Sequence, residues 1–230
     1  MPNFDILRES KPNKTFRVSS VMGKFDLQTE HIKEHFKGNI DLPNNWQIGL
    51  IVGNSGTGKT TIAKELFEDA YITKFNYKAE TILDDMPKTA SIDDITKIFN
   101  SVGFSSPPSW LKPYAVLSNG QKMRVDLANA LLKEDKLIVF DEFTSVVDRN
   151  VAKIGSYAMQ KAIRKSDKQF IAVTCHHDVQ NWLLPDWVFN TDSMTFQILE
   201  GQKKIDQKLN LKYSKQEISQ YGEYLLNTTI

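Results

Sequence analysis

Short apolar runs alternate along the chain with stretches in which apolar residues recur at helical spacing. Runs that fit strands lie at 46–52, 136–140 and 169–174, the second with the composition of a buried parallel strand, and further strands are expected near 187–199. Segments with helical spacing or helix-starting residues lie at 59–69, 92–102, 122–132, 151–165 and 214–227. Strands that alternate with helices favour a mostly parallel sheet covered by helices. The pattern therefore predicts an α/β protein.

The N-terminal part of the chain has a different pattern. Residues 16–27 alternate enough for a pair of strands, and residues 30–38 have the composition of a short charged helix. We expect a single domain with a core, a short helical insertion and a helical tail. The domain covers residues 1–230. Its core comprises residues 16–85 and 135–200, the helical insertion residues 86–134, and the tail residues 201–230.

A phosphate-binding pattern follows the apolar run Ile48–Val52 directly. Residues 53–60 fit G-x-x-x-x-G-K-[ST], in which glycines let backbone N–H groups point at phosphate oxygens where a helix begins. Lys59 adds charge for the terminal phosphates, and the Thr60 hydroxyl suits Mg²⁺. The alternative, a glycine-rich turn with a chance lysine, is disfavoured by the strand before it and the helix after it. The predicted nucleotide contacts are Gly53, Asn54, Ser55, Gly56, Thr57, Gly58, Lys59, Thr60 and Thr61.

Two adjacent carboxylates, Asp141 and Glu142, end the apolar run at 136–140. At the carboxyl end of a parallel strand, Asp141 is suited to hold Mg²⁺ and Glu142 to act as general base on the attacking water. Taken alone, such a pair also fits a helix cap or a turn. Together with the phosphate loop, the pair favours hydrolysis of a nucleoside triphosphate.

Between these motifs, Leu117-Ser118-Asn119-Gly120-Gln121 opens a helical stretch. Here the chain resembles the ATP-binding cassette (ABC) ATPase family, whose signature is L-S-G-G-Q. The order of the other family motifs is present too: phosphate loop, signature, paired acids, Ser145-Val146-Val147-Asp148 as the D-loop, and a histidine after a strand. The resemblance covers residues 16–189 and implies a P-loop NTPase core of ABC type. It also implies antiparallel N-terminal strands and a short helical insertion that carries the signature.

The resemblance implies ATP and Mg²⁺ as ligands and an ATP-dependent homodimer. Two copies would sandwich two ATP molecules head to tail, so that the phosphate held by Lys59 of one copy meets the signature of the other. A helix N-terminus that presents a hydroxyl and N–H groups is suited to bind phosphate. The signature contacts implied in this way are Ser118, Asn119, Gly120 and Gln121. Asn119 keeps an N–H and tolerates glycine-like backbone better than most residues, so we expect at most some weakening.

A switch histidine that orders the attacking water is also implied. His176 and His177 both follow the predicted strand 169–174, and neighbouring side chains of a strand point to opposite faces. The spacing to Asp186, which resembles the acid after this histidine in the family, favours His176. We take Glu142 and His176 as the catalytic pair, with His177 as the alternative.

Two family features are missing or uncertain. No glutamine occurs between Thr61 and Leu117, where the family has one that helps to coordinate Mg²⁺. Asp84 or Asp85, after a strand expected at 80–83, is the nearest substitute, and a solvated turn explains both equally well.

The family also stacks adenine on an aromatic ring before the phosphate loop. Phe25 is our choice over Phe16, although an early-strand aromatic is commonly part of a core.

Composition narrows the partners. The chain is 40% apolar with a net charge of +1, which fits a globular domain and disfavours an extended nucleic-acid groove. Cys175 is a lone cysteine and forms no internal disulfide. No apolar run approaches the roughly 20 residues of a membrane span. We therefore expect a cytoplasmic protein without direct membrane insertion.

Segments 106–111, 146–149 and 175–178 are similar to small stand-alone ABC-type ATPases of phages and mobile elements. Some of these are related to ATPases fused with a predicted acetyltransferase. The resemblance implies an ATPase that drives an unidentified soluble protein partner, with action on nucleic acid unsupported by the residues. The missing glutamine and short insertion favour this over the ATP-binding subunit of a membrane transporter. Glu142 favours it over a slow nucleotide-gated assembly module.

Overall fold

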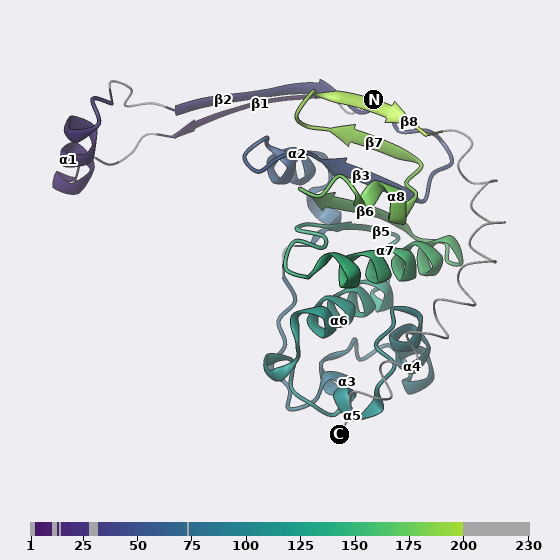
Figure 1. The fold of residues 1–230 in the computed structure, drawn as a ribbon. Coiled ribbons are helices and arrows are strands. Elements are labelled where there is room, and N and C mark those ends of the chain that lie inside the picture. The colour runs from purple at the N-terminus through teal and green to yellow at the C-terminus, as the bar shows by residue number, and fades with distance from the viewer. Residues whose placement is uncertain (1–2, 11–12, 14, 28–31, 73, 200–230) are drawn as a thin grey trace.

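A mixed sheet of six strands, in the order β4-β5-β6-β3-β7-β8, organises the structure (Figure 1). The computed structural model describes residues 3–10, 13, 15–27, 32–72 and 74–199. All neighbouring pairs are parallel except β7 with β8. The strands are β3 (Ile48–Val52), β4 (Tyr71–Ile72), β5 (Leu137–Phe140), β6 (Gln169–Thr174), β7 (Trp187–Asn190) and β8 (Thr195–Ile198). The α/β fold predicted from the sequence is confirmed.

Alternate residues of the central strands enter two cores on opposite faces of the sheet. Ile48, Leu50 and Val52 belong to the core that packs against α6 (Asn119–Leu132), α7 (Arg149–Arg164) and α8 (Val179–Leu183). Ile51 belongs to the other core, which includes α2 (Lys59–Leu66). Gly49 lies on the same face as Ile51, where a Cβ would stand 2.1 Å from the ring of Trp187. Both faces of the sheet are therefore covered, which explains the continuous apolar runs.

The helical part lies on the side of α6 and α7 that faces away from the sheet (Figure 1). It contains α3 (Ile82–Asp85), α4 (Ile92–Ser101), α5 (Pro107–Trp110) and the short 3₁₀ turn η2 (Tyr114–Val116), whereas a second 3₁₀ turn, η1 (Glu68–Ala70), follows α2. The helix predicted after Ser91 is confirmed, with Ser91 as its N-cap and Ile95 and Phe99 buried. The strand expected at 80–83 is wrong, because the Thr81 hydroxyl caps a helix there. Since α3 packs against α5, the helical part begins before residue 86.

An arm extends from the body and consists of β1 (Asn3–Ser10), β2 (Ile32–Asn39) and, at its tip, α1 (Phe16–Lys24) (Figure 1). The two strands pair antiparallel as a separate sheet. The predictions of strands at 16–27 and a charged helix at 30–38 are therefore wrong. Thr15 caps α1, and the alternating residues of β2 are paired by a strand about thirty positions earlier. The tail at 201–230, with its predicted helix at 214–227, lies outside the described residues.

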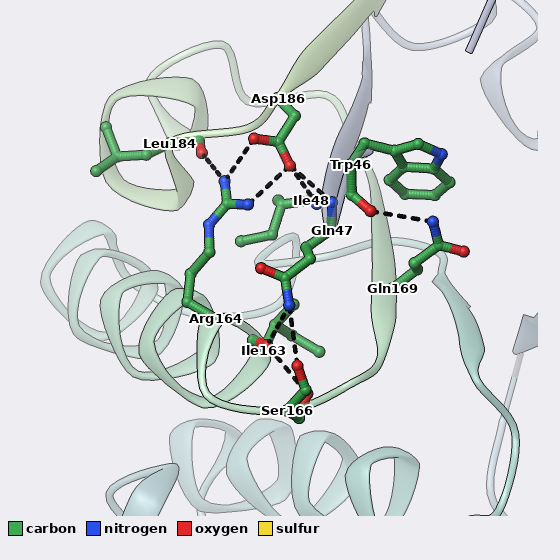
Figure 2. Close-up of polar contacts among 9 residues, drawn as sticks. All are labelled: Trp46, Gln47, Ile48, Ile163, Arg164, Ser166, Gln169, Leu184 and Asp186. Carbon is green, nitrogen blue, oxygen red and sulfur yellow. Dashed lines mark hydrogen bonds and ion pairs between the residues drawn. The ribbon is translucent and has the colours of Figure 1, made fainter. Parts of the chain in front are cut away.

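A buried polar network holds the amino-terminal edge of the sheet (Figure 2). Asp186 accepts hydrogen bonds from the backbone N–H groups of Gln47 (2.7 Å) and Ile48 (3.1 Å), where β3 begins. Arg164, at the end of α7, donates to both oxygens of this carboxylate at 2.7 and 3.0 Å. Asp186 thus lies at the edge opposite the carboxyl ends of the parallel strands. Its role here is to join β3, α7 and β7.

Candidate nucleotide-binding site

The phosphate loop runs from the carboxyl end of β3 into α2. Gly56 and Gly58 both have φ of 86°, in the left-handed region that favours glycine. A Cβ on Gly53 would lie 2.2 Å from the Thr191 hydroxyl oxygen, so the close approach of these two segments also requires glycine. The loop is therefore shaped by the residues that the pattern identifies.

Hydrogen bonds within the phosphate loop, and others to the segment after β7, fix the conformation of the loop. The carbonyl oxygen of Asn54 accepts from Lys59 Nζ at 2.6 Å and from the Thr57 hydroxyl at 2.9 Å. Asn54 N–H donates to Asp192 at 2.8 Å, and Thr57 shares a hydrogen bond of 2.5 Å with Thr191. Lys59 is buried, and its ammonium group here contacts a neutral carbonyl oxygen. A cation held over a loop of N–H groups fits the terminal phosphates of a nucleotide.

Thr60 and Asp141 meet at the carboxyl edge of the sheet, as predicted. The Thr60 hydroxyl donates to the Asp141 carboxylate at 3.0 Å, and the Tyr71 hydroxyl donates to the same oxygen. Burial and the neighbouring Asp141 carboxylate raise the pKa of Tyr71, so this hydroxyl stays protonated. Hydroxyl and carboxylate oxygens are the ligands that Mg²⁺ prefers, and protein sites commonly supply one or two of them beside substrate phosphates. The donor set therefore fits Mg²⁺.

The turn after Asp141 is strained. Glu142 and Thr144 have φ of 53° and 68°, in the left-handed region that non-glycine residues rarely adopt. Phe143 between them is fully buried, and its N–H donates to the Val173 carbonyl of β6 at 2.9 Å. This anchor fixes the turn and leaves the Glu142 side chain exposed. The acid that we predict as general base is thus presented to solvent at the edge where the phosphate loop lies.

The two candidate histidines have different surroundings. His176 Nδ1 lies 3.3 Å from the Thr144 hydroxyl, in the turn that carries Glu142. Partial burial, and secondarily the charge of Arg149, lower the pKa of His176, which keeps the imidazole neutral near pH 7. His177 is exposed, and its Nε2 lies 3.5 Å from a carboxylate oxygen of Asp192. The contact with the Glu142 turn supports His176 over His177.

The signature segment begins α6. The Ser118 hydroxyl accepts from Gln121 N–H at 3.3 Å, and the Gln121 side chain accepts from Ser118 N–H at 3.0 Å, which is a capping box. Asn119 lies in the first turn and is not among the residues with positive φ, so this position does not require glycine. Gly120 does have a packing reason, because a Cβ there would stand 3.0 Å from Val151. Ser118 and Asn119 are exposed, and α6 packs against α4 and α7 instead of α2.

The predicted adenine contact is not near the phosphate loop. Phe16 lies in α1 and Phe25 at its end, at the tip of the arm; they are 87% and 65% exposed. The predicted substitutes for the missing glutamine are also elsewhere. Asp84 and Asp85 lie in or beside the α3 region, which Figure 1 places far from α2. There Asp85 accepts hydrogen bonds from two backbone N–H groups, and Asp84 accepts one from the Thr81 hydroxyl. Both carboxylates therefore form local hydrogen bonds.

Several residues at the site were not predicted, among them Tyr71, Thr144, Thr191 and Asp192. The last two follow β7, the strand beside β3, and as polar residues inside the stretch predicted as strand at 187–199 they marked a strand end at this edge. Arg8 of β1 was also missed; it donates to the Thr61 hydroxyl at 2.9 Å. A cleft of about 510 Å³ adjoins this contact and extends to Thr60 and Tyr71. No sequence signal connects Arg8 to this place.

Known proteins give two related names for this architecture. A model of the NB-ARC domain family matches residues 29–181, more than half of the chain. An "Uncharacterized ABC transporter ATP-binding protein" of Haemophilus influenzae is 28% identical over 198 residues, covering 73% of this chain and 77% of the relative. The "Energy-coupling factor transporter ATP-binding protein EcfA1" of Leuconostoc mesenteroides is 34% identical over 90 residues, 39% of this chain. The chain spans only 30% of the length of that relative.

Solved structures agree on the fold. The dimeric, post-hydrolysis ATP-binding cassette MJ0796 bound to ADP and Pi has a TM-score of 0.60 at 14% identity, covering 86% of this chain and 98% of that one. A bacterial Atm1-family ABC exporter with ATP bound has a TM-score of 0.51 at 20% identity, covering 63% of this chain and 32% of that one. At these identities the likeness concerns the fold.

The chain belongs to the NB-ARC domain family, whose model matches residues 29–181. By sequence it is similar to ABC transporter ATP-binding proteins and by fold to an ABC cassette bound to ADP and Pi, and ATP with Mg²⁺ fits the residues of its site. The NB-ARC match and the similarity to ABC proteins both include the phosphate loop and the strand that Asp141 follows. The similarity to ABC proteins also accounts for the signature at the start of α6 and the histidine after β6, and the proposal below builds on it. None of the helices in the described part of the chain is long and apolar enough to cross a membrane.

Proposed function

We propose that this chain binds and hydrolyses ATP in a head-to-tail homodimer and thereby drives a conformational change in a soluble protein partner. One observation carries the proposal. The phosphate loop, Thr60, Asp141 and the Glu142 turn gather at one edge of the sheet, whereas the signature is presented on a helix that packs elsewhere. A site completed by the signature of a second copy explains why Ser118 is exposed.

Each residue at the sheet edge has a chemical role in this proposal. Lys59 and the loop N–H groups bind the terminal phosphates, and Thr60 with Asp141 would hold Mg²⁺, which neutralises phosphate charge. Glu142 takes a proton from the attacking water. His176, neutral and held beside Thr144, donates or accepts a hydrogen bond that orders this water and the γ-phosphate.

The signature supplies the remaining contacts from the second copy. The start of α6 presents the Ser118 hydroxyl and backbone N–H groups at the positive end of a helix of 14 residues. ATP binding then favours the closed dimer, and hydrolysis removes the charge that both copies share. The two assemblies differ in affinity for a partner, which is how hydrolysis performs work.

The proposal includes a soluble protein as the partner. It is supported by the resemblance to stand-alone phage-type ATPases and by the strand that pairs with β5, which ends at Ile72 without a glutamine after it. A second candidate, the ATP-binding subunit of a membrane transporter, is favoured by the transporter names of the relatives. Chemical cross-linking of the ATP-trapped protein in its native cells separates them. A soluble protein among the cross-linked products supports our proposal, and an integral membrane protein supports the transporter.

Steady-state release of phosphate from Mg-ATP tests the activity. We expect Glu142→Gln to retain ATP binding and to lose about 10²–10⁴-fold in turnover. Lys59→Ala should weaken ATP binding itself. Glu134→Gln is the matched control, because Glu134 is an exposed acid before β5 and outside the site. Turnover by Glu142→Gln equal to that of the Glu134→Gln control would exclude Glu142 as the base.

A further inference from the structure

The arm is the feature that the ATPase site does not use. Its helix α1 has nine residues, and none of them is buried. Val18, Val21, Met22 and Phe25 fall on one side of this helix or at its end, by their spacing of three and four. Val21 and Phe25 are 51% and 65% exposed. An apolar helical face held away from the body is a surface for association.

The base of the arm is anchored beside the nucleotide site. Phe4 of β1 and Phe36 of β2 are buried in the core that includes α2, and Phe4 meets Phe189 edge to face at 5.7 Å. The ring of Phe36 lies where a Cβ on Gly58 would stand 2.5 Å from it. Arg8 donates to Thr61, one residue after the predicted Mg²⁺ ligand. The arm is therefore fixed to the phosphate loop and α2.

The direction of the arm indicates what α1 meets. In Figure 1, β1 leaves the body toward the side at which the arrows of β6 and β7 end. This is the carboxyl edge of the parallel strands, where the phosphate loop and Glu142 lie. In the proposed head-to-tail dimer the second copy covers that edge. A strand of eight residues spans roughly 26 Å, which is enough to carry α1 across a neighbouring copy.

We propose that α1 packs against the helical part of the second copy and clasps the ATP-bound dimer. In that dimer the core of one copy faces the signature of the other, and the segment before the signature exposes two large apolar side chains. Leu111 and Val116 are 64% and 66% exposed there, and Val116 lies two residues before Ser118. The inference rests on the proposed dimer, and it adds an interface outside the two ATP molecules.

Dimer affinity in the presence of Mg-ATP tests the clasp. In a Glu142→Gln background, Val21→Asp with Phe25→Asp places two charges on the apolar face. Ser19→Asp with Ser20→Asp places two charges on the opposite face and is the matched control; all four residues are exposed. Sedimentation equilibrium should give a dimer dissociation constant at least about tenfold higher for the first variant, with less than twofold change for the control.

The outcomes separate the two proposals. A Glu142→Gln protein that stays monomeric with saturating Mg-ATP refutes the dimer and therefore the clasp. A dimer whose affinity is unchanged by Val21→Asp with Phe25→Asp refutes the clasp alone. Phe25→Cys with Val116→Cys, in a Cys175→Ser background, identifies the contact. A bismaleimide should join two copies only when ATP is present. Equal cross-linking without ATP would contradict the proposed clasp.

Discussion

Removal of the Asp186 carboxylate should be among the most damaging single changes in this chain. Asp186→Ala leaves the N–H groups of Gln47 and Ile48 without their acceptor and removes the partner of the largely buried Arg164 guanidinium. Breaking a buried ion pair costs about 3–5 kcal/mol, and an orphaned buried N–H about 1–3 kcal/mol. These costs are not additive, so we expect a loss of about 4 kcal/mol in the free energy of unfolding.

The half-exposed pair of Arg149 with Asp178 provides the comparison. Loss of such a pair costs about 0–1 kcal/mol because water screens it. In urea unfolding followed by circular dichroism, with a slope of about 2.5 kcal/mol per molar, Asp186→Ala should lower the midpoint by about 1.6 M. Asp178→Ala should lower it by less than about 0.4 M. Equal shifts in the two variants would refute the reasoning that burial decides the value of these pairs.

Three further results are expected. His176→Ala should slow ATP turnover at least about tenfold with ATP binding retained, whereas His177→Ala should have little effect; the reverse would reassign the switch histidine. Arg8→Ala should weaken the binding of ATP, measured by calorimetry. An unchanged affinity would show that the cleft beside Arg8 and Thr61 is not part of the nucleotide site. Burial raises the pKa of Asp126 to about 6, so folding takes up a proton and stability rises as the pH falls. Between pH 7.5 and 5 the wild type should gain about 1 kcal/mol over Asp126→Asn; equal pH profiles would contradict this.

The central part of the fold and the nucleotide site were predictable because their signals are local. A loop that needs left-handed glycines, a lysine and a threonine must have those residue types in a fixed order, and the phosphate loop does. Buried parallel strands must be apolar on both faces, which identified β3, β5 and β6. The contact between Thr60 and Asp141 was expected because the phosphate loop that leads to Thr60 follows β3, and Asp141 follows β5 at the same edge of the sheet.

The arm could not be predicted because its pairing is not local. Residues 32–39 form a strand only because residues 3–10 lie beside them, and the helix between the strands separates the two in sequence. The same reason explains why the predicted adenine contact, Phe25, is close to the phosphate loop in sequence but lies at the tip of the arm. Asp84 and Asp85 were mistaken for a strand end because a capping threonine precedes a helix of only four residues.

The mass of Glu142→Gln in solution, by light scattering on a sizing column with and without Mg-ATP, is the most direct test of the account. The account predicts a monomer that doubles its mass only when ATP is present. A mass that stays unchanged at saturating ATP would contradict the sandwich dimer, and with it the role that we assign to the exposed signature at Ser118.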